Sequence, residues 1–225
     1  MLSKPFIAIA ERPRAGGALE SAVWFADMAP PEIFVVGGPN GAGKSTIASV
    51  ILPEGFQVER FVNADLIAQG LAPASPEPRA FTAGRMMLQR VRDLYLQRER
   101  FGFESTLASR TFAPFLEDAQ GAGYLVHIAY MWLSSVELAL DRIRVRVLRG
   151  GHDVPEGTVR RRYYRRLVNF FDLYLALANT WLLCDNSRSE LVEVARGGLQ
   201  IAPTILEPRT YATIERQLAD ARTRG

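Results

Sequence analysis

Short runs of apolar residues alternate along the chain with longer stretches in which apolar positions recur every three or four residues. The short runs predict buried strands, and the periodic stretches predict amphipathic helices. Strands are expected at about 32–37, 58–63, 101–107, 124–133, 181–187 and 190–196. Helices are expected after the first strand to about residue 52, and at about 79–98, 111–120, 136–149, 158–179 and 208–222. This alternation predicts a parallel sheet with helices on both faces.

The first 30 residues are the hardest part of the chain to assign. Residues 18–28 are consistent with one short amphipathic helix, which Pro30 and Pro31 would end. We expect this helix to pack Trp24 and Phe25 against the domain; a docking arm for a partner and a partly disordered lead are the alternatives. The expected organisation is an N-terminal segment at 1–30 and one α/β domain at 31–225.

A glycine-rich loop follows the first expected strand. It fits the pattern G-x-x-x-x-G-K-[ST] of a phosphate-binding loop, with a strand before it and a helix after it. Glycines let backbone N–H groups turn toward phosphate oxygens, and the following helix adds its positive N-terminal end. A chance match in a glycine-rich turn would lack this context. The predicted ATP-binding residues are Gly38, Asn40, Gly41, Ala42, Gly43, Lys44, Ser45 and Thr46.

Lysine usage supports this interpretation. The chain holds 27 lysines and arginines, and only Lys4 and Lys44 are lysines. A lysine at position 44 indicates a need for a compact ammonium group, which can contact the β- and γ-phosphates. The hydroxyl of Ser45 is the predicted magnesium ligand. ATP and Mg²⁺ are therefore the expected cofactors.

Two acidic residues follow strands that should flank this loop. Because the carboxyl ends of parallel strands meet at one edge of a sheet, Asp65 and Glu104 are expected beside the loop. Asp65 is the predicted catalytic residue, which would orient an acceptor hydroxyl and take its proton; the alternative is a helix N-cap. Glu104 is expected to hold magnesium, to hold a substrate hydroxyl, or to pair with Arg85 or Arg110.

Arginines surround the Gly-Gly loop at 150–157, on the two helices that the loop joins. They are Arg142, Arg144, Arg146, Arg149, Arg160, Arg161, Arg162, Arg165 and Arg166. Such a pair of helices predicts a lid over a triphosphate, in which arginine neutralises the transferred phosphoryl group. Arg162 and Arg165 share one helix face and are the predicted catalytic arginines, and Arg146 is expected to contact ATP. For most of the others, a solvated helix face is the simpler interpretation.

The composition of the chain restricts which classes of protein it can belong to. Of 225 residues, 48% are hydrophobic, which is enough for a core, and no apolar run approaches the roughly 20 residues of a membrane helix. The single cysteine excludes an intrachain disulfide, and the cytosol is the expected location. A net charge of +3 does not argue for nucleic acid. The helix expected at 79–98 rests on the apolar spacing of Met86, Met87, Val91, Leu94 and Leu96, and the positions expected in the core include His127, Trp132, Trp181 and Cys184.

In this order, these motifs resemble the zeta-toxin family of P-loop kinases over about residues 32 to 187. The matching stretches are 37–46, 61–65, 103–107, 150–155, 161–169 and 185–187. The resemblance implies an α/β P-loop NTPase three-layer sandwich with a mainly parallel sheet and a helical, arginine-rich lid. It also implies ATP-dependent phosphorylation of a hydroxyl on UDP-N-acetylglucosamine or a related sugar nucleotide.

The resemblance assigns roles to individual residues. It implies that Lys44 grips the phosphates, that Ser45 helps to hold magnesium, and that Asp65 acts as the base. Arg162 and Arg165 are the nearest matches to the arginines that stabilise the transfer. The predicted substrate-binding residues are Glu104, Thr106, Arg85, Arg110 and His152. Toxic members of the family pair with a small antitoxin, so an antitoxin protein is an expected partner.

Two other functions stay open at this point. One is an ATP-binding switch or slow ATPase that acts through a protein partner, in which residues 1–30 could take part. The other is a polynucleotide kinase, favoured by the basic lid but lacking stacking aromatics there apart from Tyr163 and Tyr164. A membrane partner is not expected, and nucleic acid ranks below a small-molecule acceptor.

Overall fold

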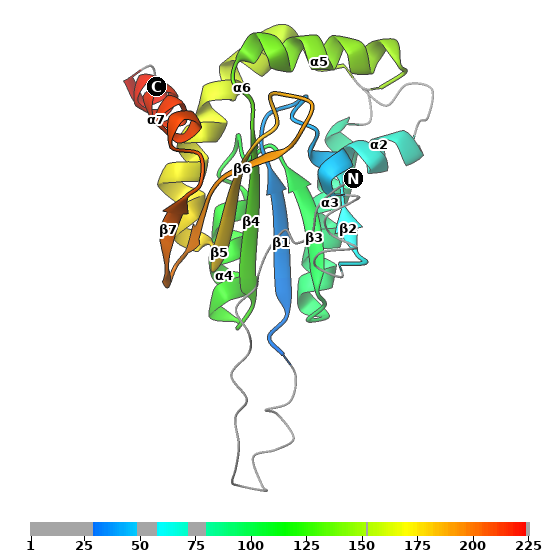
Figure 1. The fold of residues 1–225 in the computed structure, drawn as a ribbon. Coiled ribbons are helices and arrows are strands. Elements are labelled where there is room, and N and C mark those ends of the chain that lie inside the picture. Colours follow the sequence, from blue (N-terminus) through cyan, green and yellow to red (C-terminus); the bar gives the residue numbers. More distant parts are fainter. Residues whose placement is uncertain (1–28, 49–57, 72–79, 152, 224–225) are drawn as a thin grey trace, which may run out of the picture.

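A seven-stranded sheet forms the centre of the protein, and helices lie against it and across the edge where its parallel strands end (Figure 1). The computed structural model describes residues 29–48, 58–71, 80–151 and 153–223. The strands are β1 (Glu32–Gly37), β2 (Phe61–Val62), β3 (Phe101–Ser105), β4 (Leu125–Trp132), β5 (Thr180–Asp185), β6 (Val192–Gly198) and β7 (Ile201–Ile205). The helices are α2 (Ala64–Leu71), α3 (Ala80–Leu96), α4 (Phe112–Gly121), α5 (Val136–Leu148), α6 (Glu156–Asn169) and α7 (Pro208–Thr223).

The strand order is β2-β3-β1-β4-β5-β6-β7, and the first five strands are parallel. The strand before the glycine-rich loop, β1, therefore lies between β3 and β4. Its register pairs Val36 with Glu104 and Gly37 with Ser105. The ends of β1, β2 and β3 consequently meet at one edge, as the sequence predicted, and the loop at 38–45 lies at this edge.

Alternate residues of β1 face two separate apolar cores. Ile33 and Val35 belong to the core that α3, α4, the end of α6 and α7 cover. Phe34 and Val36 belong to the core that α5, the start of α6 and the helix beginning at Lys44 cover. Burial on both faces explains why β1 reads as a continuous apolar run rather than as an alternating one.

Several boundaries differ from the predictions. Helix α2 was not predicted, because the prolines that follow it indicated a loop. The tail folds as an antiparallel hairpin, β6 and β7, rather than as one strand. The helix expected at 158–179 begins at Glu156, ends at Asn169, and continues as a π-helical turn and a 3₁₀ turn. The wide π turn brings both Phe170 and Tyr174 into the core.

Most of the expected core residues are buried. Trp132, Trp181 and Cys184 are buried, as predicted. On α3, the stripe of Met87, Val91 and Leu94 is buried. Met86 and Leu96 belong to the same apolar spacing but are exposed, because they lie off the buried stripe, which follows the 3.6-residue period of the helix. The helix expected at 18–28 and the end of the helix after the loop lie outside the described residues. None of the helices in the described ranges is long and apolar enough to cross a membrane.

Leu94 and Leu96 offer a matched test of this packing. Leu94 is 1% exposed and Leu96 is 66% exposed, although they stand two residues apart on α3. We expect L94A to lower the free energy of unfolding by about 2–5 kcal/mol, because it leaves a cavity in the core. L96A should change it by less than about 0.5 kcal/mol. Urea denaturation measures both; equal losses would contradict the assigned face of α3.

His127 provides a second test. Its ring stacks on Phe34 at a centroid distance of 4.8 Å, and Nδ1 lies 2.7 Å from the Thr180 hydroxyl. Burial, helped by the charge of Arg100, lowers the pKa of His127 to about 4. Because the unfolded chain binds this proton near pH 6.5, stability should fall as the pH drops from about 6.5 to 4.

We expect this histidine to contribute roughly 3 kcal/mol at most to that loss, since its pKa differs by about 2.5 units between the two states. H127Q removes the titrating group and should flatten the pH dependence in this window. The measurement is the urea midpoint of the wild type and of H127Q between pH 4 and 7. An unchanged slope in H127Q would show that other groups cause the acid sensitivity.

Candidate functional site

The glycine-rich loop passes so close to its neighbours that side chains would collide there. A Cβ at Gly41 would lie 2.8 Å from the Ala139 carbonyl oxygen, and one at Gly43 would lie 2.7 Å from Nδ2 of Asn186. Both glycines also have positive φ angles, 79° and 74°. Asn186 donates a hydrogen bond to the Ala42 carbonyl (2.8 Å), which ties the loop to the end of β5. Glycine is therefore required for both the conformation and the close approach.

Lys44 begins the helix after the loop, and its side chain folds back over the loop. The side chain is only 5% exposed, and its ammonium group donates to the Pro39 carbonyl (2.9 Å) and lies 3.4 Å from Oε1 of Glu104. Burial lowers the pKa of Lys44, and the carboxylate of Glu104 opposes that shift. The ammonium thus stands inside the curve of the loop, where the sequence predicted it.

Glu104, Ser45 and Asn63 form one hydrogen-bonded cluster beside this ammonium. The hydroxyl of Ser45 donates to Oε2 of Glu104 (2.5 Å), and Nδ2 of Asn63 donates to the same oxygen (2.7 Å). The cationic partner of Glu104 is Lys44. The pairing with Arg85 or Arg110, one of the three alternatives for Glu104, is not formed, and both of these arginines are exposed.

Asp65 lies in the first turn of α2, close enough for its charge to act on Lys44. It is not the N-cap, since Asn63 has that role: Oδ1 of Asn63 accepts from the backbone N–H groups of Asp65 (2.7 Å) and Leu66 (3.3 Å). The Asp65 carboxylate is 44% exposed and lies 3.9 Å from Nη1 of Arg146. It is thus accessible beside the loop, as a proton acceptor must be, and Arg146 reaches it from the end of α5.

Arg166 is the lid arginine that touches the loop. It is fully buried, and Nη2 donates to Oδ1 of Asn40 (2.5 Å), while Nε and Nη1 have no hydrogen-bond partner among the described residues. Burial lowers its pKa to about 10; Tyr130 opposes this shift, and the charges of Arg162 and Arg165 reinforce it. A buried cation with unused donors beside a phosphate loop is suited to bind an anion.

The predicted catalytic arginines, Arg162 and Arg165, do not make this contact, and their catalytic role stays a prediction. Both side chains are exposed, and no hydrogen bond or ion pair within the described ranges joins them to the loop. Arg166 was in the cluster but was not singled out. The signal was present, because Arg166 continues the buried stripe of Val159 and Tyr163 on α6. The other missed residues are Asn63, which caps α2, and Asn186, which anchors the loop.

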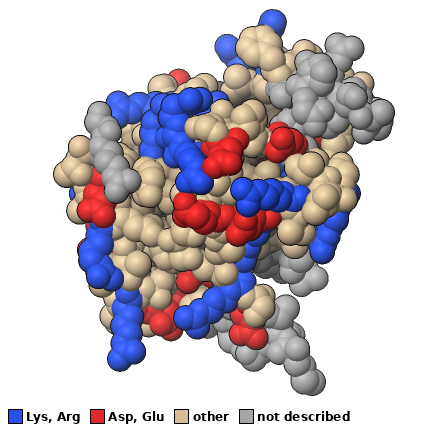
Figure 2. Space-filling view, turned by 90° about the horizontal axis from the view of Figure 1, so that it is seen from above, with Lys and Arg blue, Asp and Glu red and all other residues tan. Residues whose placement is uncertain are grey.

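Much of the remaining lid charge is paired on the surface. Arg160 bridges Glu137 of α5 (2.9 Å) and Glu156 of α6 (2.8 Å), and Arg144 bonds Asp141 (2.7 Å). Viewed along the strands, basic and acidic side chains lie side by side on this face (Figure 2). This mixture agrees with the predicted solvated helix faces and differs from a uniformly basic nucleic-acid surface.

Thr106 lies in a loop that α6 and the turn after it hold in place. Leu107 has a φ of 53°, and Asn169 donates to its carbonyl (2.8 Å), while the Tyr174 hydroxyl donates to the Ser109 carbonyl (2.8 Å). Thr106 itself is partly buried. Its role as a substrate-binding residue stays a prediction. His152 lies outside the described residues.

The donor set suits Mg²⁺ bound together with a nucleotide. Magnesium prefers oxygen ligands and usually takes one or two from the protein and the rest from phosphates and water. Ser45 and Glu104 present such oxygens 2.5 Å apart. The described residues contain no group of three His, Cys, Asp or Glu side chains that could hold a metal without substrate.

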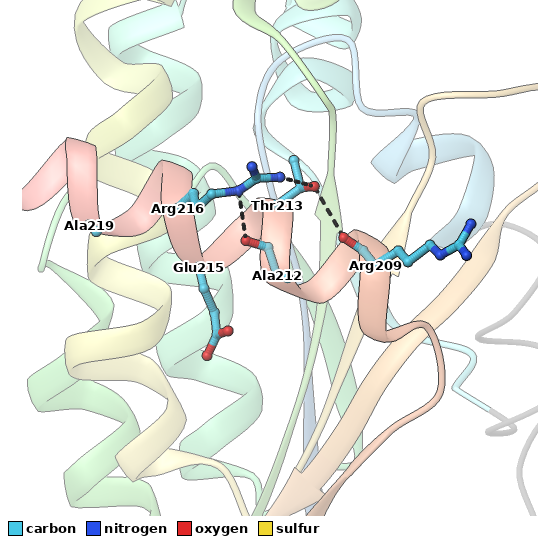
Figure 3. A pocket seen from close by; sticks show the side chains of 6 residues that line it. All are labelled: Arg209, Ala212, Thr213, Glu215, Arg216 and Ala219. Atoms are coloured by element: carbon cyan, nitrogen blue, oxygen red, sulfur yellow. Dashed lines mark hydrogen bonds between the residues drawn. The ribbon is translucent and has the colours of Figure 1, made fainter.

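A shallow hollow elsewhere on the molecule is not part of this site. It lies along α7 and is lined by Arg209, Ala212, Thr213, Glu215, Arg216 and Ala219. Figure 3 shows that Arg216 bonds Thr213 and that Thr213 bonds the Arg209 carbonyl, so these contacts stay within the helix. Helix α7 lies at the side of the sheet opposite α2 (Figure 1).

Comparison with solved structures shows which proteins share this fold. A chain of the AvrRxo1-ORF1:AvrRxo1-ORF2 complex, determined with ATP, matches with a TM-score of 0.68 and 17% identity over 84% of this chain and 64% of that chain. The PezAT toxin–antitoxin system of Streptococcus pneumoniae matches with a TM-score of 0.56 and 18% identity over 86% and 88%. At this level of identity the likeness shows a shared α/β fold.

At the level of sequence, the chain belongs to the family of a Haemophilus influenzae protein. The two are 33% identical over 126 residues, which cover 56% of this chain and 88% of the relative. The name of that relative, "Uncharacterized protein", states no function. No protein-family model matches the sequence. This chain spans 64% of the AvrRxo1 chain, so activity, substrates and partners are matters of proposal.

Neighbouring arginines on α6 provide a test of the phosphate contact. We expect R166M to leave the nucleotide-free protein as stable as the wild type or up to about 4 kcal/mol more stable, because it removes a desolvated, incompletely bonded cation. At 100 times its dissociation constant, Mg²⁺·ATP should stabilise the wild type by about 2.7 kcal/mol, and R166M should lose most of that gain.

R165M is the matched control, since Arg165 is exposed on the same helix. It should keep the stabilisation by Mg²⁺·ATP. Thermal unfolding with and without nucleotide measures both variants. Loss of the effect in R165M and its retention in R166M would restore the assignment made from the sequence.

Proposed function

We propose that this protein is an ATP-dependent small-molecule kinase, which transfers the γ-phosphoryl group of ATP to a hydroxyl group. One observation carries the proposal. The ammonium of Lys44, the carboxylates of Asp65 and Glu104, and the buried guanidinium of Arg166 converge on one phosphate-type loop from four different elements. Two cations and two carboxylates in this arrangement match the needs of phosphoryl transfer, in which charge must be neutralised and a hydroxyl must be oriented.

In this mechanism the loop and Lys44 hold the β- and γ-phosphates. Asp65 accepts the proton of the acceptor hydroxyl, whose oxygen then forms the new bond to the γ-phosphorus. The bond from phosphorus to the β,γ-bridging oxygen breaks, and ADP leaves with that electron pair. Arg166 neutralises charge on the phosphates from the lid side, because its unused N–H groups lie next to the loop.

Magnesium, when bound, would neutralise phosphate charge at Ser45. The hydroxyl of Ser45 is already oriented by Glu104 and Asn63. Glu104 is then suited to hold the acceptor or to orient this hydroxyl, and the close packing of α5 against Gly41 helps to exclude water from that side of the loop.

The acceptor that we propose is UDP-N-acetylglucosamine or a related sugar nucleotide. The support comes from the motif resemblance together with the two carboxylates that flank the loop. A small antitoxin is the proposed protein partner, because the AvrRxo1 and PezAT neighbours are complexes of paired proteins, PezAT being a toxin–antitoxin system.

The test is incubation of the protein with Mg²⁺·ATP and UDP-N-acetylglucosamine, followed by mass spectrometry of the products. We expect a phosphorylated sugar nucleotide. D65N should lower the rate of transfer about 10²–10⁴-fold, because the proton acceptor is lost, and should leave ATP affinity within about twofold. The matched control is D118N on the distant helix α4, which should retain the wild-type rate.

The outcomes separate the competing functions. Transfer to a different acceptor would refute the sugar-nucleotide substrate and leave the kinase assignment in place. An ATP-binding switch would show no transfer to any acceptor, and D65N would leave its slow hydrolysis unchanged.

A further inference from the structure

We propose that Asn63 is a positioning residue, which fixes the two carboxylates and the Ser45 hydroxyl relative to one another through a single amide group. The catalytic part of this inference rests on the proposed kinase function. Asn63 is only 4% exposed and makes four hydrogen bonds, two through each end of its amide. Three of these four bonds go to candidate site residues, Ser45, Glu104 and Asp65, so this buried side chain is more than a helix cap.

The oxygen end of the amide sets the position of Asp65. It accepts from the backbone N–H groups of Asp65 (2.7 Å) and Leu66 (3.3 Å) and thereby starts α2. Strand β2 ends one residue earlier, after only two residues in the sheet. The start of α2, and with it the Asp65 carboxylate, therefore depends strongly on this side chain.

The nitrogen end of the same amide sets the positions of Glu104 and Ser45. It donates to Oε2 of Glu104 (2.7 Å) and to Oγ of Ser45 (3.2 Å). These residues come from β3 and from the helix after the loop. One planar group thus joins three chain segments and fixes their separation at the proposed site of transfer.

Only an amide side chain of this length can both accept hydrogen bonds at the start of α2 and donate to Glu104 and Ser45. Aspartate has the same shape and is an equally good N-cap, but it has two acceptors and no donor. Serine is also a good N-cap, but its hydroxyl ends one atom short of the terminal nitrogen that Glu104 contacts. The charged group that faces Glu104 is Lys44, and Asp65 and Arg166 are the other charges that act on Lys44.

Unfolding of four variants of the full chain tests the hydrogen-bond geometry without any activity assay. The variants are N63S, N63D, E104Q and the exchanged pair N63D/E104Q, all compared at pH 8 in EDTA. If Asn63 acted only as the N-cap of α2, N63D should be at least as stable as N63S. The proposed geometry predicts the opposite order, because N63D directs a carboxylate at Glu104.

The exchanged pair gives the sharper result. E104Q should lower the denaturant midpoint in the wild-type background and raise it in the N63D background, because donor and acceptor are then reversed across the same contact. This change of sign is the expected coupling. The inference is overturned if N63D is as stable as N63S, or if E104Q lowers the midpoint equally in both backgrounds.

Kinetics test the positioning role. We expect N63S to lower kcat for phosphoryl transfer about 10–100-fold, the usual effect of losing a group that orients a reacting side chain, with the Kd for ATP within about twofold of wild type. A purely structural role would lower the unfolding midpoint and leave kcat near the wild-type value in folded protein. That result would overturn the positioning role.

The two proposals fail in different ways. A wild-type protein that phosphorylates no acceptor refutes the proposed function and with it the kinetic part of this inference, while the unfolding experiment still decides the hydrogen-bond geometry. An active wild-type protein whose N63S variant is equally active refutes the role of Asn63 alone.

Discussion

The site depends on the burial of one ammonium group. Removing Lys44 from water is costly unless a carboxylate lies close to it, and Glu104 provides that carboxylate at 3.4 Å. This contact requires β3 to pair with β1 in the register that places Glu104 opposite Val36. The register of the sheet therefore determines where the carboxylate meets the ammonium group. Asn63 and Ser45 complete the bonds of Glu104, which brings the start of α2 to the same place. Asp65 is beside the loop as a consequence.

The contact between α6 and the glycine-rich loop depends on a second buried cation, which has fewer of its hydrogen-bond donors paired than Lys44 has. Arg166 has one hydrogen bond to Asn40 and two nitrogen atoms without a partner among the described residues. Such a group lowers the stability of the nucleotide-free protein, and an anion bound at the loop would compensate for it. Stability and ligand binding are thus opposed at this position, as is common for functional residues. The surface pair of Arg160 on α6 with Glu137 on α5 links these two helices and needs no ligand.

Comparison with solved structures establishes the fold, and the charged groups of the site support the proposed activity. Identity of 17–18% to the solved structures establishes a shared fold, and a fold hosts many functions. The kinase proposal therefore rests on the geometry of the charged groups in this chain. The proposals of a sugar-nucleotide acceptor and of an antitoxin partner rest on resemblance to known proteins.

The sequence by itself determined the elements whose signals are local. The phosphate loop, the strand at 32–37 and the placement of Asp65 and Glu104 at one edge followed from glycine spacing, apolar runs and the rule for parallel strands. Only the tertiary structure decided which arginine reaches the loop, which side chain caps α2, and that Glu104 pairs with Lys44 rather than with Arg85 or Arg110. The reason is physical: a local pattern shows which residue types lie near a turn or on a helix face. The partner of a buried charge depends on how distant segments pack and on which cation the core removes from water.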